Sequence, residues 1–593
     1  MQKTVFAPLV AATLLTASGH GVWAGDISPL RVTLSDSGAG AATICRINFS
    51  FPGTLYKTGL LVITFPKGFD VSGAVIAASP DQSIDGGFTV SADSDSCKVT
   101  VFRDGTGSHK NGYANATISL ALITNSTAPD TAYRISMKTY DLSGIRVDGP
   151  NDSSPFSIVP APLHHFDLTG IPTGLTAGSS FPDTVTVTAK DAYNNTITGY
   201  TGTVSWTSTD AQAVLPAPGG GFSGGQKSFA GWSFVLKTAG AQTVTVTDTA
   251  AGVSRESGPI AVSAGALASF TLSNPDTQTA GVGFALSVSE AKDQYNNAAS
   301  GLVTVTVASG GGSAPNGAAP QLADIVVVNG SGSSMQTLFN AVPTELRGQS
   351  GSITRTTGTI TVLPAGLGRL AIAGYPTRLR AQSDFGDNNV AISAYDLYDN
   401  PKTNYDGQIY FTSSDDSATL PYDVNNRYTF LPADNGVHTF PGSGFVLSTP
   451  GLQTIAVHDF ERGIQKSSNS IDVYALEITS ISCLAATVSQ GQQGVQVSMA
   501  VRNLGVQPVT ITGANLSFSS GQPPQDRSAD YVVVRSDNAT QIPGGGVQNL
   551  TFSVGVKGSA TTDIVTVDGS VAGLYAGTTA VSAIGAATKH LWT

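Results

Sequence analysis

The sequence predicts an all-β protein made of tandem antiparallel β-sandwich modules in an elongated array. Runs such as TVTVTA (184–189) and TVTVTD (243–248) alternate with the period of two that is typical of half-buried strands. Hydrophobic residues make up 40% of the chain and charged residues 12%, with 67 glycines and 30 prolines. A nearly identical short segment also recurs three times. Together these observations favour folded modules of short strands over disorder.

The first 24 residues predict a secretory signal. One lysine precedes an apolar run from Val5 to Leu15, and Val22-Trp23-Ala24 forms a V-x-A cleavage site, so we expect cleavage after Ala24. No later run approaches the roughly 18 apolar residues of a membrane span. We therefore expect an acidic, exported mature chain, extracellular or associated with a cell surface, without a transmembrane segment.

Residues 25–160 predict an N-terminal β-sandwich, with strand-like runs LLVITFPKGFDVSG (60–73) and YRISMKTYDLSG (133–144). Cys45 and Cys97 both fall in such runs, and in an exported protein they predict a disulfide. The alternative is two buried thiols. Cys483 has no predicted partner and is expected to be a buried thiol.

The recurring segment reads DAYNN, DQYNN and DLYDN, starting at Asp191, Asp293 and Asp396. The intervals of 102 and 103 residues match the size of a seven-stranded sandwich of the immunoglobulin type and exceed solenoid periods. The repeats are predicted at 161–264, 265–365 and 366–474, and the middle one is divergent. TVSWTSTDAQAVLP (203–216) and QIYFTSSDDSATLP (408–421) keep the first and third in register.

Each copy of this segment predicts a turn between two strands. The aspartate can accept backbone N–H groups two residues on, and the fourth residue (Asn194, Asn296 or Asp399) is expected in the left-handed region. The tyrosines between them are expected to pack on the sandwich edge. A calcium site is the alternative, weakly supported because the first two copies carry only one acid each.

Residues 475–593 predict a further sandwich with different turns, at Asn503-Leu504-Gly505 and Gly544-Gly545-Gly546. The pattern from VTAKDAYNNTITGYTGTVSWTSTD to FVLKTAGAQTVTVTD resembles the tandem immunoglobulin-like repeats of bacterial surface proteins of the invasin and filamin type. The last segment is similar to adhesion-related domains of exported bacterial proteins. These resemblances imply spacing, display and sometimes adhesion, and no particular ligand.

No catalytic, zinc or phosphate-binding motif is present, so no catalytic or cofactor residues are predicted. His164 and His165 would point to opposite faces of a strand. Asp93 and Asp95 are interpreted as a solvated loop before the Cys97 strand, with paired catalytic acids as the alternative. Trp206 is expected in a core, because it aligns with Phe411, and the role of Trp232 is open.

The first functional hypothesis is a non-catalytic extracellular protein of the cell surface or of adhesion, with the repeats as spacers and a terminal module as binding tip. The alternative is a carbohydrate-binding accessory protein, and a third hypothesis is a hydrolase hidden in residues 25–160. Expected partners are other surface proteins or polysaccharide. A net charge of −11 without basic clusters argues against nucleic acid.

Overall fold

The computed structural model describes residues 25–78 and 83–593, so the predicted signal lies outside the described residues. The regular secondary structure of the described chain consists of β-strands and four single-turn 3-10 helices, which confirms the all-β prediction. It forms two compact units. The first contains the residues up to Ala266 together with Asp293–Ala298, and the second contains Leu267–Lys292 and Ala299–Thr593.

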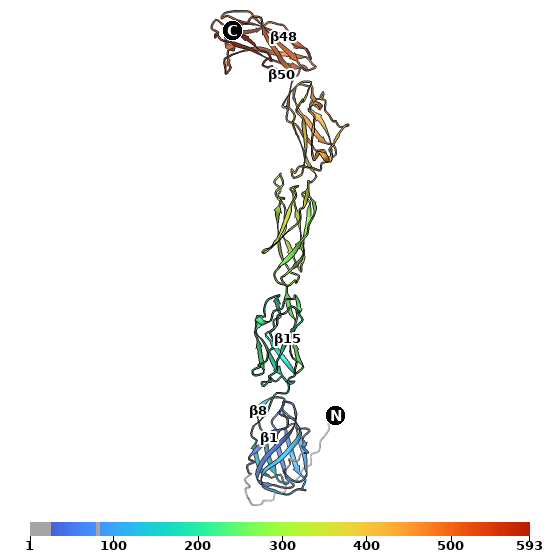
Figure 1. Cartoon of the computed structure of the whole chain (residues 1–593), viewed down its shortest axis with the longest axis vertical. Coiled ribbons are helices and arrows are strands. Elements are labelled where there is room, and N and C mark those ends of the chain that lie inside the picture. Colours follow the sequence, from blue (N-terminus) through green and yellow to red (C-terminus); the bar gives the residue numbers. More distant parts are fainter. Residues whose placement is uncertain (1–24, 79–82) are drawn as a thin grey trace, which may run out of the picture. The chain divides into compact units, whose positions relative to one another are not determined.

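The described chain contains five separate hydrophobic cores. Figure 1 shows its strands grouped into successive β-sheet modules. Alternate strand residues face these cores, as the period-two pattern requires. We call the parts around them the N-terminal module, repeats 1, 2 and 3, and the C-terminal module. Their core residues fall within Ile27–Ile158, Phe166–Val262, Phe270–Ala365, Leu367–Val473 and Ala475–Trp592, except that Leu504 belongs to the core of repeat 3.

The N-terminal module has a four-stranded sheet in the order β1-β2-β7-β4, a five-stranded sheet in the order β10-β9-β3-β6-β5, and the pair β11-β8. Its strands are β1 (Leu30–Leu34), β2 (Ala42–Leu55), β3 (Leu60–Thr64), β4 (Val75–Ile76), β5 (Phe88–Asp93), β6 (Lys98–Arg103), β7 (Lys110–Thr124), β8 (Asp130–Tyr133), β9 (Ser136–Tyr140), β10 (Arg146–Asp152) and β11 (Phe156–Ile158).

The predicted disulfide between Cys45 and Cys97 is wrong, since both thiols are free. Cys45 is fully buried on β2, between β1 and β7, and burial raises the pKa of its thiol to about 12. Cys97 lies in the turn before β6 of the other sheet. Its thiol lies 3.7 Å from the carbonyl oxygen of Phe69 and 3.8 Å from that of Ser94. The two side chains therefore have separate surroundings.

The repeats are antiparallel except for one parallel pair in each: β13 with β20, β22 with β29, and β31 with β41. Repeat 1 contains β12 (His165–Thr169), β13 (Gly174–Thr176), β14 (Val185–Lys190), β15 (Ser205–Ser208), β16 (Gln226–Phe229), η1 (Gly231–Ser233), β17 (Gly240–Gln242), β18 (Val244–Asp248), β19 (Val253–Glu256) and β20 (Ile260–Ser263). Repeat 2 contains β21 (Ser269–Leu272), β22 (Thr277–Thr279), β23 (Gly283–Lys292), β24 (Gly301–Ser309), β25 (Ile325–Val327), β26 (Gly332–Thr337), β27 (Glu345–Ser350), β28 (Ile353–Thr356) and β29 (Thr361–Leu363).

Repeat 3 contains β30 (Leu367–Ala373), β31 (Arg378–Arg380), β32 (Ser383–Asp384), β33 (Val390–Asp396), β34 (Gln408–Ser413), β35 (Tyr428–Thr429), η2 (Pro432–Asp434), β36 (Val437–Phe440), η3 (Gly442–Gly444), β37 (Val446–Leu447), β38 (Gly451–Gln453), β39 (Ile455–Asp459), β40 (Gln465–Ser467) and β41 (Ile471–Tyr474). In all three repeats the motif aspartate directly follows, or ends, the strand that pairs with the first strand of the module. The turn motif therefore occupies the same place in each repeat.

The C-terminal module packs the sheet β42-β43-β48-β46 against a six-stranded sheet built on β45-β44-β49-β50, with β47 on β44 and β51 on β49. Its elements are β42 (Leu476–Cys483), β43 (Val495–Asn503), β44 (Val509–Ser520), β45 (Gln525–Asp526), η4 (Ser528–Asp530), β46 (Tyr531–Arg535), β47 (Gln541–Ile542), β48 (Val547–Val556), β49 (Val565–Tyr575), β50 (Thr579–Ile584) and β51 (His590–Trp592).

Candidate functional site

The three copies of the D-x-Y-[ND]-N segment form the same hydrogen-bonded turn. In the first copy, Oδ1 of Asp191 accepts the N–H groups of Tyr193 (2.9 Å) and Asn195 (2.8 Å), and the other two copies repeat this pair of bonds. The fourth residue has a φ of 63° at Asn194, and the equivalents Asn296 and Asp399 have 69° and 63°. Asn and Asp are the non-glycine residues that adopt this left-handed conformation most readily.

The second carboxylate oxygen joins the turn to the segment that enters the module. Oδ2 of Asp396 accepts the N–H of Ala365 and one N–H of the Asn400 side chain, both at 2.8 Å. Oδ2 of Asp191 likewise accepts the backbone N–H of Ala161 and a side-chain N–H of Asn195. Oδ2 of Asp293 accepts the backbone N–H of Gly265 and a side-chain N–H of Asn297. Each of these buried aspartates therefore accepts four hydrogen bonds.

These hydrogen bonds decide the ionisation of two of the aspartates. Burial opposes the charged form of Asp191, but hydrogen bonds from the Asn195 side chain and from the N–H groups of Ala161, Asn195 and Tyr193 outweigh it and lower the pKa. The pKa of Asp293 is lowered for the same reasons, by Asn297, Gly265 and Tyr295. Hydrogen bonds that favour the charged form are worth more than neutral ones, so each carboxylate holds its turn firmly.

The last asparagine of the motif binds the module before its own. Asn400 of repeat 3 donates from Nδ2 to the carbonyl oxygen of Phe339 (2.8 Å), in repeat 2, and its Oδ1 accepts the N–H of Ala341 (3.0 Å). Only 1% of Asn400 is exposed. The side-chain amide of Asn400 therefore donates to and accepts from repeat 2, while its second Nδ2 hydrogen is donated to Asp396 in its own module. We call this arrangement the asparagine clamp.

The other two asparagines make the same contact. Asn297 donates to the carbonyl oxygen of Lys237 (2.7 Å) and accepts the N–H of Ala239 (2.8 Å), all within the first compact unit. Asn195 donates to the carbonyl oxygen of Thr127 (2.7 Å). The residue equivalent to Ala239 is Pro129, which has no N–H to donate. The first clamp therefore lacks one of the bonds that the others have.

Each motif tyrosine lies against a glycine of the preceding module, and not on its own sandwich edge as the sequence analysis expected. A Cβ on Gly40, Gly178 or Gly281 would collide with the ring of Tyr193, Tyr295 or Tyr398, respectively. These glycines also have positive φ values of 67°, 84° and 77°. Glycine is required there both by the backbone and by the tyrosine of the next module.

The N-terminal module, repeat 1 and repeat 2 each carry an Ala-Gly pair where the tyrosine of the next module lies. The alanine N–H bonds to the last strand of its own module, and the glycine N–H bonds to the loop beside the clamp, as for Ala280 with Leu363 and Gly281 with Leu338. Repeat 3 makes the same two bonds through Ala381 and Gln382, whose φ is 60°. No motif tyrosine follows repeat 3, so a side chain fits there.

The sequence pattern indicated the turn aspartates and the left-handed residues, but not the clamp asparagines or the partner glycines. A signal was present. The fourth position varies between Asn and Asp, whereas the fifth is Asn in all three copies. A carboxylate cannot donate, so the fifth position was the one that required an amide.

The other sequence candidates do not form a common site. Asp93 ends β5 and accepts the N–H (3.3 Å) and hydroxyl (2.5 Å) of Ser96, so it serves its own hairpin. His164 and His165 do not point to opposite faces of a strand as expected, because His164 precedes β12. Their rings contact each other edge to face, with the Nδ1 atoms 3.2 Å apart. In the described part of the chain, no three His, Cys, Asp or Glu side chains are grouped as a metal would require. Nor does any helix there have the length and hydrophobicity needed to cross a membrane.

A buried arginine organises the loops at one end of the N-terminal module. The side chain of Arg103 donates to the carbonyl oxygens of Leu55, Tyr56, Asp85 and Ser108 at 2.9 to 3.1 Å. Strand pairing places these loops opposite the end that carries Thr127. The exposed side chains at this end include Tyr56, Phe102, His109, Leu142 and Ile145. This loop end therefore exposes apolar and aromatic groups beside loops that Arg103 joins by hydrogen bonds.

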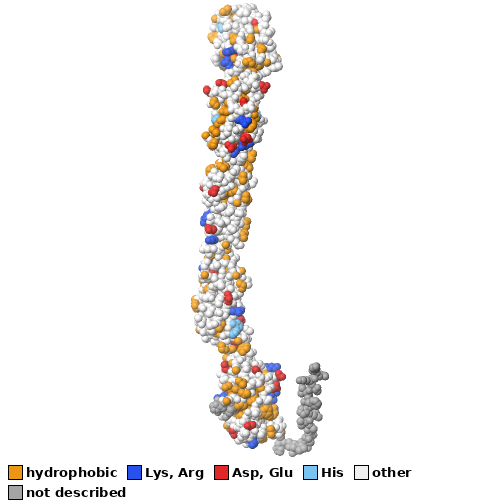
Figure 2. Space-filling view, turned by 90° about the vertical axis from the view of Figure 1, so that its right-hand side faces the viewer, with side chains coloured by type: hydrophobic (Ala, Val, Ile, Leu, Met, Phe, Trp, Pro, Cys, Tyr) orange, Lys and Arg blue, Asp and Glu red, His pale blue; other side chains and the backbone are white. Residues whose placement is uncertain are grey.

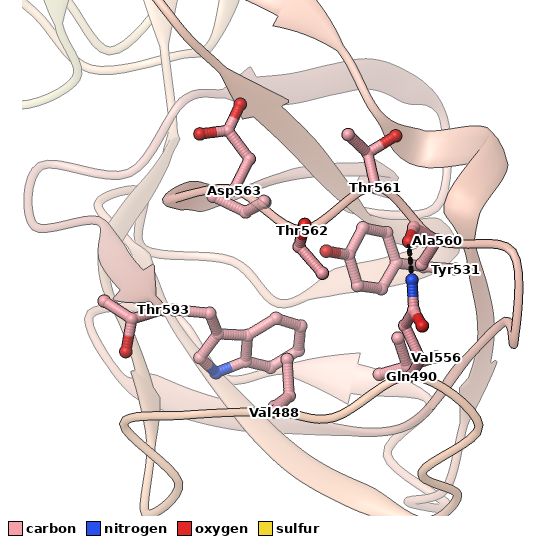
Figure 3. Close-up of a pocket in the computed structure, with 11 residues that line it drawn as sticks. Val488, Gln490, Tyr531, Val556, Ala560, Thr561, Thr562, Asp563 and Thr593 are labelled. Carbon is pink, nitrogen blue, oxygen red and sulfur yellow. Dashed lines mark hydrogen bonds between the residues drawn. The ribbon is translucent and has the colours of Figure 1, made fainter.

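The C-terminal module contains a cavity of about 90 Å³ (Figure 3). Tyr531 and Trp592 line it, and the side chain of Gln490 bridges its edge to the carbonyl oxygen of Ala560 at 2.5 Å. Ligand pockets generally measure about 300–1,000 Å³, so this space is a packing gap beside the aromatic core. Figure 2 shows a face with mostly uncharged groups and charged side chains scattered over it, so charge marks out no binding surface there.

Neither the scan against protein-family models nor the search of curated proteins finds a match. Solved structures of bacterial surface proteins are similar. FdeC, described as a broadly conserved Escherichia coli adhesin, is 16% identical over 57% of this chain and 99% of its own, with a TM-score of 0.27. Invasin, described as a bacterial integrin-binding protein, is 14% identical over 78% and 82%, with a TM-score of 0.26. Surface layer protein SbsC, domains 1–6, is 14% identical over 92% and 64%, with a TM-score of 0.18. These values are too low to transfer a ligand or a residue role.

Proposed function

We propose that the chain is a non-catalytic extracellular protein of a bacterial surface. In this proposal the repeats are spacers that hold a terminal module for display or adhesion. The proposal is supported by the way the repeated chemistry is used. Asp191, Asp293 and Asp396, the three buried motif aspartates, are all engaged in turns, and the asparagine beside each binds the preceding module.

The asparagine clamp is the observation that carries this proposal. A chain whose modules worked independently would need only flexible linkers, because such linkers leave domains free to move. Here a buried amide and a tyrosine of one module are fitted to the backbone and a glycine of another. Contacts that fix adjacent modules to each other are useful to a protein that must hold a binding surface away from its anchor.

The loop end of the N-terminal module is the proposed binding surface. Leu142 is 76% exposed and Ile145 is 61% exposed, yet both belong to a hairpin held by Asp141, whose carboxylate accepts the Ile145 N–H at 2.8 Å. Exposed apolar side chains on rigid loops are typical of protein-binding surfaces, since binding them costs little conformational entropy. The partner class is therefore a surface or matrix protein.

The test is binding of the labelled mature chain, residues 25–593, to arrays of matrix proteins and polysaccharides. The L142A/I145A double variant should lose specific protein binding at least tenfold, since interface anchors of this kind contribute about 1–2 kcal/mol each. A matched variant at exposed Leu452 of repeat 3, L452A, should bind normally. Hydrolysis of an arrayed polysaccharide by the wild-type chain would contradict the non-catalytic proposal if the D93N/D95N variant did not hydrolyse it.

A second candidate, carbohydrate binding, is favoured by one residue. Trp232 is 77% exposed on η1, where repeat 3 has Ser443 in the equivalent turn. An exposed indole is a suitable stacking platform for a sugar ring. If this candidate is right, the mature chain binds a polysaccharide on the array and W232A does not. Retention of polysaccharide binding by W232A would exclude this site.

A further inference from the structure

The structure holds a buried carboxylate next to the predicted mature N-terminus. Asp148 on β10 is fully buried. Its Oδ1 accepts the N–H of Gly53 at 3.1 Å, and its Oδ2 accepts the hydroxyl of Thr139 at 3.2 Å. Among residues 25–78 and 83–593, no Lys, Arg or His side chain forms an ion pair with Asp148. Burial raises its pKa, although the bonds from Thr139 and Gly53 act in the opposite direction.

Gly25 lies directly against this carboxylate. Its backbone forms a parallel bridge with Asp148, and its carbonyl oxygen accepts the N–H of Gly149 at 2.9 Å. A Cβ on Gly25 would lie 2.7 Å from Oδ1 of Asp148 and would collide with Pro52. The Cβ and nitrogen of one residue are about 2.5 Å apart, so the Gly25 nitrogen is within roughly 5 Å of the carboxylate.

The surrounding backbone is shaped to leave room at this point. A Cβ on Gly53 would also come within 2.7 Å of Oδ1 and 2.8 Å of Oδ2 of Asp148. The next residues of the N-terminal segment are fixed as well, because the N–H of Ile27 donates to the side chain of Asn151 at 2.8 Å. Gly25 and Ile27 are therefore both bound to β10.

We propose that removal of the signal after Ala24 creates an α-ammonium group at Gly25 that forms an ion pair with the buried carboxylate of Asp148. An isolated carboxylate is costly to bury, and a cation at hydrogen-bonding distance offsets that cost. In the uncleaved chain the same nitrogen is a neutral amide and cannot do so. Processing thus completes the N-terminal module. This inference is independent of the proposed spacer and adhesion role.

The reactivity of the Gly25 α-amine tests the ion pair. An α-amine has an ordinary pKa near 7.7–8.0, and an adjacent carboxylate that raises it by one unit leaves about tenfold less neutral amine at pH 7. The mature full-length chain is treated with an acylating reagent at pH 7. Tryptic peptide 25–31, GDISPLR, contains no lysine, so its modification reports the α-amine alone.

We expect the mature wild-type chain to be modified roughly tenfold more slowly than two variants. The first is D148N, and the second is a chain that keeps Ala24, whose amine is displaced by one residue. The second variant preserves Asp148 and keeps the test valid if D148N does not fold. D26N, at an exposed carboxylate next to Gly25, is the control and should react like the wild type. Equal rates in the wild type and the Ala24 chain, or a mature terminus other than Gly25, would overturn the proposal.

Discussion

At the residue scale, one buried amide does what no other side chain in the motif could do. Asn400 donates twice and accepts once, and its three partners belong to a turn aspartate and to the loop of another module. An aspartate could not donate. An alanine would leave the Phe339 carbonyl and the Ala341 N–H without this partner, and it would remove one of the four hydrogen bonds to Asp396. Buried groups left without a hydrogen bond each cost about 1–3 kcal/mol.

We therefore expect N400A to lower the free energy of unfolding of repeat 3 by about 2–3 kcal/mol. Hydrogen exchange of repeat 3 peptides at increasing denaturant measures this loss. The equivalent change in the first clamp, N195A, should cost less, because Pro129 offers no N–H. The exposed neighbour Asn404 provides the control, and N404A should have little effect. Equal losses in N400A and N404A would be contrary to the clamp.

The cysteines give a second prediction at this scale. The mature chain should contain three free thiols when titrated in denaturant. In the native chain Cys45 should be unreactive, because it is fully buried and burial raises its pKa to about 12. A titre of one thiol in denaturant would contradict this prediction and indicate a disulfide between Cys45 and Cys97.

Asp191 makes the first of these turns sensitive to acid. The pKa of Asp191 is lower in the folded chain than its ordinary value of 3.8. Its stabilisation is therefore complete above that value and is lost as the pH falls through the lowered pKa. D191N should be less stable than the wild type at pH 7, and the difference should shrink towards pH 2. The exposed Asp183 supplies the control variant, D183N, for which no such convergence is expected.

At the element scale, the joint is a fit between a tyrosine on one turn and a glycine on another. G281A should destabilise the chain by about 1–3 kcal/mol, through backbone strain at a φ of 77° and collision with Tyr398. In a Y398A background the collision is gone and only the strain remains. The cost of G281A should then be smaller, which a double-mutant cycle on thermal unfolding measures.

Gln382 is the natural control for this pair. It occupies the equivalent place in repeat 3 with a φ of 60° and already carries a side chain. Q382A should change stability by less than about 0.5 kcal/mol, as is usual for surface positions. If the cost of G281A were the same with and without Tyr398, the two residues would not be coupled.

At the scale of the whole molecule, the sequence predicted what depends on local pattern. Period-two runs such as TVTVTD revealed the strands, and Trp206, expected in a core, is 7% exposed and contacts Phe229 and Phe234. What it missed depends on contacts between segments far apart. Asn297 and Lys237 are 60 positions apart, and nothing in either segment alone identifies the other. The Cys45 and Cys97 pairing failed for the same reason.

The central claim is that a side chain of one module holds the backbone of another. Hydrogen exchange of the Ala341 amide in the full mature chain tests it most directly, because this N–H donates to Asn400 at 3.0 Å. We predict that the wild-type amide is protected, and that N400A increases its exchange rate at least tenfold although Ala341 belongs to a different module. Unchanged exchange at Ala341, with faster exchange confined to residues 396–401, would contradict the clamp and with it the account of the repeats as coupled spacers.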